Sequence, residues 1–288
     1  MLLRYFKMRA ALSPSQKKFL QSLELEGSFK VSHLLKELVN IGKMDTAGDK
    51  SRKVLGVIIA ISLLVAFFSF FFLIDKAPTI LIIIEVVFLP LAITSIVLFF
   101  ILKKGDLDNN LRLFTIPFLG VLKEEMHDRG KINLSLCAKS LFEHAYRYDK
   151  QEMPPRINGF VKDYRTISYY KQTSLKGNAT LSDNTDLAFE LINLGKRISI
   201  KKVTSRKTKY KTKHKKIVKL NICLTFPKSI YTRNGAITTD MPLAISETNQ
   251  AIKVKSKVVF KGLEKDDTAP LNPSIHAIQQ LYKVVKPI

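Results

Sequence analysis

Two apolar runs, VLGVIIAISLLVAFFSFFFLI at residues 54–74 and TILIIIEVVFLPLAITSIVLFFIL at residues 79–102, decide the fold class of this chain. The first has 21 residues and no charge, and the second has 24 residues and a single charge, at Glu85. An α-helix needs about 20 apolar residues to cross the hydrocarbon core of a membrane. The four residues between the runs are too few for a domain, so the sequence predicts two antiparallel transmembrane helices joined by a short turn.

Basic residues lie almost entirely outside the two apolar runs and the turn between them. Residues 1–53 carry 11 lysines and arginines, residues 103–288 carry 35, and the turn carries one. Lysine and arginine accumulate on the cytoplasmic side of membrane proteins. The sequence therefore predicts a multi-pass protein of the plasma (inner) membrane of a bacterium, with both termini in the cytoplasm. Its segments are an N-terminal helical segment (1–53), a transmembrane hairpin (54–102) and a basic cytoplasmic domain (103–288).

Three residues distinguish the second run, namely Glu85, Pro90 and Thr94. Glu85 lies about six residues from the outer end, roughly 9 Å deep at 1.5 Å per residue, where an unpaired carboxylate is costly. We expect it to face a helix, a cavity or another subunit, either in an ion or proton pathway or as a group that reaches the external interface. Pro90 removes one backbone hydrogen bond and is expected to kink the helix, with Thr94 and Ser95 nearby to satisfy the freed polar groups.

The N-terminal segment has the pattern of two short helices. The tetrapeptide Ser13-Pro14-Ser15-Gln16 predicts a helix start, because a serine cap and a glutamine three residues later can form a capping box. Apolar residues at helical spacing in 31–41, followed by Gly42, predict a second helix. We expect a small helical hairpin, with 44–50 as a linker, that packs on the C-terminal domain or lies in the membrane interface.

In the C-terminal domain the pattern changes to a period of two, in which apolar and polar residues alternate as they do in half-buried strands. Residues 181–187, rich in serine, aspartate and asparagine, predict a turn between two strands. Helical segments are expected at 273–285 and at 111–126, the second with a break near Pro117. We expect short helices or irregular connections at 141–148 and 160–170. The domain is therefore α+β, mainly antiparallel β, with strands predicted at 132–138, 175–181, 187–194, 197–204, 217–226 and 252–261.

A basic run at 196–219 contains 12 lysines and arginines and no acidic residue. Part of it alternates lysine with Thr, Tyr or His, and an extended strand would place these alternate lysines on one side. Three interpretations remain open: contact with anionic lipid headgroups, nucleic-acid binding with Tyr210 for stacking, and a solvated loop. The residues predicted to bind the membrane or another anion are Lys201, Lys202, Arg206, Lys207, Lys209, Lys211, Lys213, Lys215 and Lys216.

The sequence contains no motif for catalysis, a cofactor or a metal. The five histidines are scattered, and no glycine-rich phosphate loop occurs. Cys137 and Cys223 lack the spacing of a metal or redox site, and we interpret them as buried, reduced thiols. We therefore expect a non-enzymatic protein without a cofactor or metal.

The charge balance indicates the class of partner. A net charge of +23 favours contact with a polyanionic surface. The main hypothesis is a membrane-anchored component of an envelope or defence assembly, whose basic domain binds partner proteins and the anionic phospholipid of the inner leaflet. The alternatives are a homo-oligomeric channel or pore lined by the second transmembrane helix and a membrane-tethered nucleic-acid binder.

Overall fold

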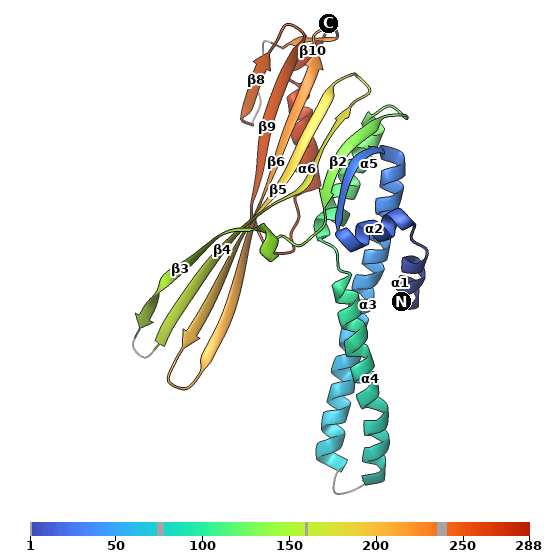
Figure 1. The fold of residues 1–288 in the computed structure, drawn as a ribbon, viewed down its shortest axis with the longest axis vertical. Coiled ribbons are helices and arrows are strands. Elements are labelled where there is room, and N and C mark those ends of the chain that lie inside the picture. Colours follow the sequence, from blue (N-terminus) through green and yellow to red (C-terminus); the bar gives the residue numbers. More distant parts are fainter. Residues whose placement is uncertain (1, 74–77, 159–160, 235–240) are drawn as a thin grey trace. The chain divides into compact units, whose positions relative to one another are not determined.

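The computed structural model describes residues 2–73, 78–158, 161–234 and 241–288 (Figure 1). The chain divides into two compact units. The helical unit comprises Met1–Leu20 and Val39–Leu107, and the sheet unit comprises Gln21–Leu38 and Asp108–Ile288. This division differs from the predicted one, because part of the N-terminal segment belongs to the sheet unit.

Two long helices dominate the helical unit: α3 (Val31–Leu73), from residue 39 onward, and α4 (Pro78–Lys104). They run side by side in Figure 1. Both are long and apolar enough to cross a membrane, judged by length and composition. Many of their large apolar side chains are exposed, such as Phe67 at 57% and Val86 at 66%. The turn predicted between the spans falls largely on residues 74–77, outside the described residues.

Two short helices, α1 (Leu2–Ala10) and α2 (Pro14–Ser22), precede the long ones. The start of α2 has the predicted capping box. Ser13 Oγ accepts a hydrogen bond from Gln16 N (3.2 Å), and Gln16 Oε1 accepts one from Ser13 N (2.8 Å). Two backbone donors at the helix start are thereby satisfied.

The predicted helical hairpin in this segment is wrong. A strand, β1 (Glu24–Lys30), separates α2 from α3. α3 then continues through Gly42 and through the predicted linker at 44–50. A glycine inside a helix costs only about 0.5–1 kcal/mol, which is too little to end a helix that runs on into a long apolar segment.

The sheet unit is built on an eight-stranded antiparallel sheet in the order β1-β2-β4-β5-β6-β9-β8, with β3 paired to β4. A second sheet pairs β7 with β10. The predicted mainly antiparallel domain is thus confirmed. The strands after β1 are β2 (Lys131–Cys137), β3 (Arg147–Asn158), β4 (Val161–Thr180), β5 (Asp186–Val203), β6 (Thr208–Pro227), β7 (Tyr231–Arg233), β8 (Leu243–Glu247), β9 (Ala251–Leu263) and β10 (Val285–Pro287).

One face of this sheet packs against two helices, α5 (Ile116–Glu125) and α6 (Leu271–Tyr282). Alternate residues of the strands point to this face and are buried, among them Phe189 of β5 and Phe226 of β6. Phe118 of α5 lies edge-on to Phe189, with ring centroids 5.1 Å apart, and Tyr282 of α6 lies edge-on to Phe226 at 5.1 Å. The amphipathic helix predicted at 273–285 is therefore confirmed.

Pro117 does not interrupt a helix as predicted. A π-helical turn, Leu111–Thr115, precedes α5, and Pro117 lies in the first turn of α5. Proline is tolerated there because the first backbone N–H groups of a helix have no intrahelical acceptor.

Several strands are longer than predicted. Segments 187–194 and 197–204 join in the single strand β5, and most of 160–170 belongs to β4. Gly195 breaks the apolar alternation of β5 because Phe142 packs directly on its backbone. A Cβ at Gly195 would lie 2.8 Å from Phe142 Cε1. The break in the sequence pattern is therefore a packing requirement and does not end the strand.

Strand β3 was not predicted. It is a highly exposed edge strand with two prolines, Pro154 and Pro155, at a shift in its pairing with β4. Proline is compatible with a sheet at an edge or a bulge, where no ladder hydrogen bond is lost. Backbone pairing rather than apolar alternation defines this strand.

Candidate functional site

Strands β5 and β6 continue beyond β9 as a hairpin, residues 196–215, which we call the basic arm. β9 pairs with β6 only as far as Lys216, whereas β5 and β6 stay paired to Val203 and Thr208. The Thr204 N–H donates to the Lys207 carbonyl (3.0 Å) and closes the turn. Figure 1 shows the arm beside the β3–β4 hairpin, with which it forms a four-stranded ribbon.

Alternate lysines of β6 lie on one side of the arm. Lys209, Lys211, Lys213 and Lys215 are all exposed. Residues directly opposite each other in an antiparallel pair share a face of the sheet. Lys202 pairs with Lys209 and Lys196 with Lys215, so these two lysines of β5 lie on the same side.

The same side continues into the body of the sheet, where β9 contributes three further lysines. Lys253, Lys255 and Lys257 are exposed and pair with Thr225, Cys223 and Asn221 of β6. These three lysines were not predicted as site residues, although lysine alternates with apolar residues and serine along 252–258. We call this surface the basic face. It comprises Lys196, Lys202, Lys209, Lys211, Lys213, Lys215, Lys219, Lys253, Lys255 and Lys257.

The part of this side in the body of the sheet is hollowed. An open hollow of about 1460 Å³ extends over this face from β1 to β8, and its lining residues include Lys176, Glu190, Lys255 and Lys257. Cys223 also lines it and is only partly buried, as is Cys137, so the prediction of two buried thiols is wrong. Cys223 is only partly buried because its side chain points to the same side of β6 as the alternate lysines.

Like charges oppose each other directly within the basic face. The pairs Lys196–Lys215 and Lys202–Lys209 each place two ammonium groups on adjacent strands, an arrangement that destabilises a sheet. Asp163 is opposite Lys202, but its carboxylate does not neutralise the lysines alone, because Arg165 Nη2 donates a hydrogen bond to its Oδ2 (2.8 Å). That hydrogen bond lowers the pKa of Asp163. A bound polyanion would relieve the repulsion among the lysines.

Not every residue predicted to bind anions belongs to the basic face. Lys201 pairs with Tyr210 and lies on the opposite side of the arm, while Arg206 and Lys207 lie at its turn. All three are exposed.

The prediction that Lys216 binds an anion is wrong, because this residue is only 2% exposed. Lys216 Nζ donates to the Asp267 carbonyl (2.7 Å), and burial lowers the pKa of its ammonium group. Its side chain points to the face of the sheet that the helices cover, as do those of Val218 and Leu220, so Lys216 is a structural residue.

The polar residues of the second apolar run lie in the helical unit. Glu85 is half-buried, and Ser69 of α3 donates a hydrogen bond to its Oε1 (3.4 Å). Glu85 thus faces the neighbouring helix, one of the arrangements predicted for it. Pro90 lies inside α4, which continues to Lys104, and Thr94 is exposed.

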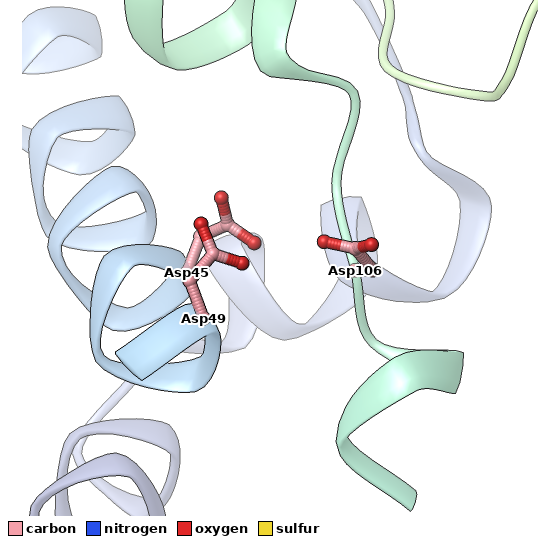
Figure 2. A group of neighbouring side chains, drawn as sticks. All are labelled: Asp45, Asp49 and Asp106. Atoms are coloured by element: carbon pink, nitrogen blue, oxygen red, sulfur yellow. The ribbon is translucent and has the colours of Figure 1, made fainter. Parts of the chain in front are cut away.

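Three aspartates of the helical unit lie near one another, two from α3 and one from the segment after α4 (Figure 2). One carboxylate oxygen from each of Asp45, Asp49 and Asp106 lies within 4.8 Å of the others. Carboxylates are ligands that Mg²⁺ and Ca²⁺ prefer. Arg52, however, bonds both Asp49 and Asp106, the latter at 2.6 Å. Its guanidinium already supplies a positive charge, so the cluster is explained as an ion-pair network.

The basic face is assembled from strands that are far apart in sequence, and it gathers ten lysines on one side of the sheet unit. Ammonium groups bind phosphate and carboxylate oxygens through charge-assisted hydrogen bonds. Comparisons of the chain with protein-family models, with curated proteins and with solved structures find no match. A functional assignment therefore depends on the geometry of this chain.

Proposed function

We propose that this chain is a non-enzymatic membrane-anchored protein whose sheet unit binds an anionic membrane surface through the basic face. The observation that carries the proposal is the gathering of ten lysines from β5, β6 and β9 on the side opposite α5 and α6. In this proposal α3 and α4 cross the plasma membrane, and both termini lie in the cytoplasm. Phosphate groups of the inner leaflet are then the nearest abundant anions.

The energy available from this contact is large. Each basic residue close to an anionic lipid surface contributes about 1 kcal/mol. The four alternate lysines of the basic arm would together contribute about 4 kcal/mol, which corresponds to roughly a thousandfold change in partitioning. The repulsion within the pairs Lys196–Lys215 and Lys202–Lys209 adds to the advantage of the bound state.

The geometry favours lipid over nucleic acid. Binding of single strands combines a positive groove with aromatic side chains on which bases stack. Tyr210 is 75% exposed, but it pairs with Lys201 on the side opposite the basic face. Tyr169 lies on the basic face, yet the Lys196 ammonium already covers its ring at 5.4 Å. Tyr148 is 64% exposed and packs beside Tyr169, with ring centroids 6.2 Å apart, so the aromatics of this side gather near Lys196. Further along the arm, Lys209, Lys211 and Lys213 are opposite Lys202, Ile200 and Ile198. A row of lysines without aromatic rings between them suits a flat layer of phosphates better than bases.

The test uses tryptophan reporters in the full-length chain, which has no tryptophan of its own. Met153 lies on the side of the basic face, in register with Arg165, Ile200 and Lys211, whereas Tyr210 lies on the other side. In vesicles that contain anionic brominated lipid, we expect quenching of Met153→Trp but little quenching of Tyr210→Trp. Neutral brominated lipid or high salt should abolish the difference, because salt screens exposed charges.

A matched pair of variants separates the face from net charge. Lys211→Gln/Lys213→Gln alters the basic face, and Lys162→Gln/Lys201→Gln removes the same charge from the opposite side. Only the first pair should reduce the quenching of Met153→Trp. An equal loss of quenching in both pairs of variants would contradict the proposal. It would also be contradicted if the vesicle-bound chain retained single-stranded RNA while anionic brominated lipid failed to quench Met153→Trp.

A further inference from the structure

Helix α1 has two apolar stripes, and only one of them packs inside the protein. Leu2, Tyr5 and Met8 face inward: Tyr5 is 2% exposed, and the other two are partly buried against it and its neighbours. Leu3, Phe6 and Ala10 form the second stripe, at positions i, i+3 and i+7 of the helix. All three are exposed, Leu3 at 76% and Phe6 at 37%.

The inward stripe fixes α1 at one end of the two long helices. Tyr5 belongs to a buried cluster with Leu55 and Leu102, which lie at the beginning of the first apolar run and at the end of the second. A Cβ at Gly48 would lie 3.3 Å from Tyr5 Cε2, and one at Gly105 would lie 3.1 Å from Tyr5 Oη. Figure 1 shows α1 beside this end of α4. α1 is therefore level with the boundary at which the apolar spans end.

Basic residues flank the exposed stripe. Arg4 and Lys7 follow it on one side of the helix, and Arg9, whose Nη1 donates to Tyr5 Oη (3.5 Å), borders it on the other. An apolar stripe with lysine and arginine beside it is typical of helices that lie in the plane of a membrane interface. The position at the ends of the spans and the sign of the flanking charges both indicate the same occupant, an anionic lipid interface.

We infer that α1 is an interfacial helix whose Leu3, Phe6 and Ala10 insert at the boundary between headgroups and acyl chains. Arg4 and Lys7 then lie at the level of the lipid phosphates. The inference rests on the proposal that α3 and α4 cross a membrane, but it does not depend on the basic face. In this arrangement α1 holds the end of the hairpin at a fixed depth through Tyr5.

Three single-tryptophan variants of the full-length chain in vesicles test this inference. Phe6→Trp reports on the exposed stripe, and Phe70→Trp reports on the first span, where Phe70 is 51% exposed. Lys17→Trp is the control, because Lys17 lies on the exposed, polar side of α2. We expect shallow brominated lipid to quench Phe6→Trp, deep brominated lipid to quench Phe70→Trp, and neither to quench Lys17→Trp.

The outcomes separate the two proposals. If Phe70→Trp is quenched and Phe6→Trp is not, the spans are inserted and the interfacial role of α1 is refuted. If the Phe6→Trp emission is blue-shifted without quenching by lipid, protein covers the stripe, and the inference also fails. If Phe70→Trp escapes quenching, the membrane anchor itself is wrong, and the inference falls with it.

Discussion

Asp183 joins three separate parts of the sheet unit, and its replacement by asparagine should loosen all three. The residue lies in the predicted turn at 181–187, which the structure confirms with a hydrogen bond from Leu181 N to Thr185 O (2.9 Å). Asp183 Oδ2 accepts hydrogen bonds from Tyr231 Oη of β7 (2.7 Å) and Tyr282 Oη of α6 (3.1 Å). Its Oδ1 accepts one from Thr185 N (2.9 Å).

The magnitude follows from these contacts. Hydrogen bonds to a charged group contribute about 1.5–3 kcal/mol each, and asparagine retains one carbonyl oxygen without the charge. Because Asp183 is half-buried and solvent screens part of the effect, we expect Asp183→Asn to cost about 1–2 kcal/mol. That cost corresponds to roughly 5–30-fold faster opening of the turn, β7 and the C-terminal end of α6.

The same contacts give a pH dependence with a defined sign. Burial opposes ionisation of Asp183, but hydrogen bonds from Tyr231, Thr185 and Tyr282 outweigh it and lower the pKa of the carboxyl group below its ordinary value. A lowered carboxyl pKa contributes stability above the unfolded pKa of about 3.9, and this stability is lost as pH falls through the folded pKa. The difference between wild type and Asp183→Asn should therefore shrink below about pH 4.

Amide hydrogen exchange of the full-length chain in nanodiscs measures this effect locally. Asp186→Asn is the matched control: Asp186 flanks the same turn and accepts a bond from Thr180 Oγ1 (2.7 Å), but it is exposed. We expect its effect to stay within about 0.5 kcal/mol, as for most surface substitutions. Equal acceleration of exchange in the two variants would refute the reasoning, as would an Asp183→Asn effect that is the same at pH 3 and pH 7.

Two further predictions concern the sheet. Gly177→Ala would place a Cβ 2.8 Å from both the Asn133 carbonyl oxygen and Phe189 Cζ, so it should lower the free energy of unfolding by about 1–3 kcal/mol. Gly120→Ala in α5 is the control, because a Cβ there has nothing within 4 Å, and it should raise the free energy of unfolding by about 0.5–1 kcal/mol. Thermal unfolding measures both. Two destabilised proteins of similar melting temperature would contradict this. Lys209→Glu turns the like-charge pair with Lys202 into an attractive pair. It should stabilise the tip of the basic arm by roughly 0.2–1 kcal/mol, which is measured as slower amide exchange. Lys211→Glu is the control, because Lys211 is opposite Ile200, and it should not slow the exchange. The same slowing in both variants would show that net charge, not pairing, controls the tip.

Features that depend on neighbouring residues were predictable. The apolar runs, the capping box at Ser13 and Gln16, the turn at 181–187 and the helix at 273–285 all arise within a few turns or residues of chain. Local propensity and periodicity determine such elements, so their signal is present in any window that contains them. The errors began where a local pattern was interrupted for a distant reason, as at Gly195.

The candidate site shows the same division. Alternation along β6 predicted that Lys209, Lys211, Lys213 and Lys215 share one side, because successive side chains of a strand point to opposite faces. Whether that side is open or covered could not be predicted, and Lys216, one residue further, is buried. Lys253, Lys255 and Lys257 join the site only through the register between β6 and β9.

What the sequence by itself determined is therefore the two long apolar helices, the strongly basic charge and the alternating strands. Tertiary structure alone decided that residues 24–30 pair with β2 more than a hundred residues later, and that lysines of β5, β6 and β9 meet on one face. The physical reason is that strand pairing is formed by backbone hydrogen bonds, which are nearly the same for every sequence. The choice of neighbours and of the covered face comes instead from the packing of distant side chains, such as Phe118 on Phe189.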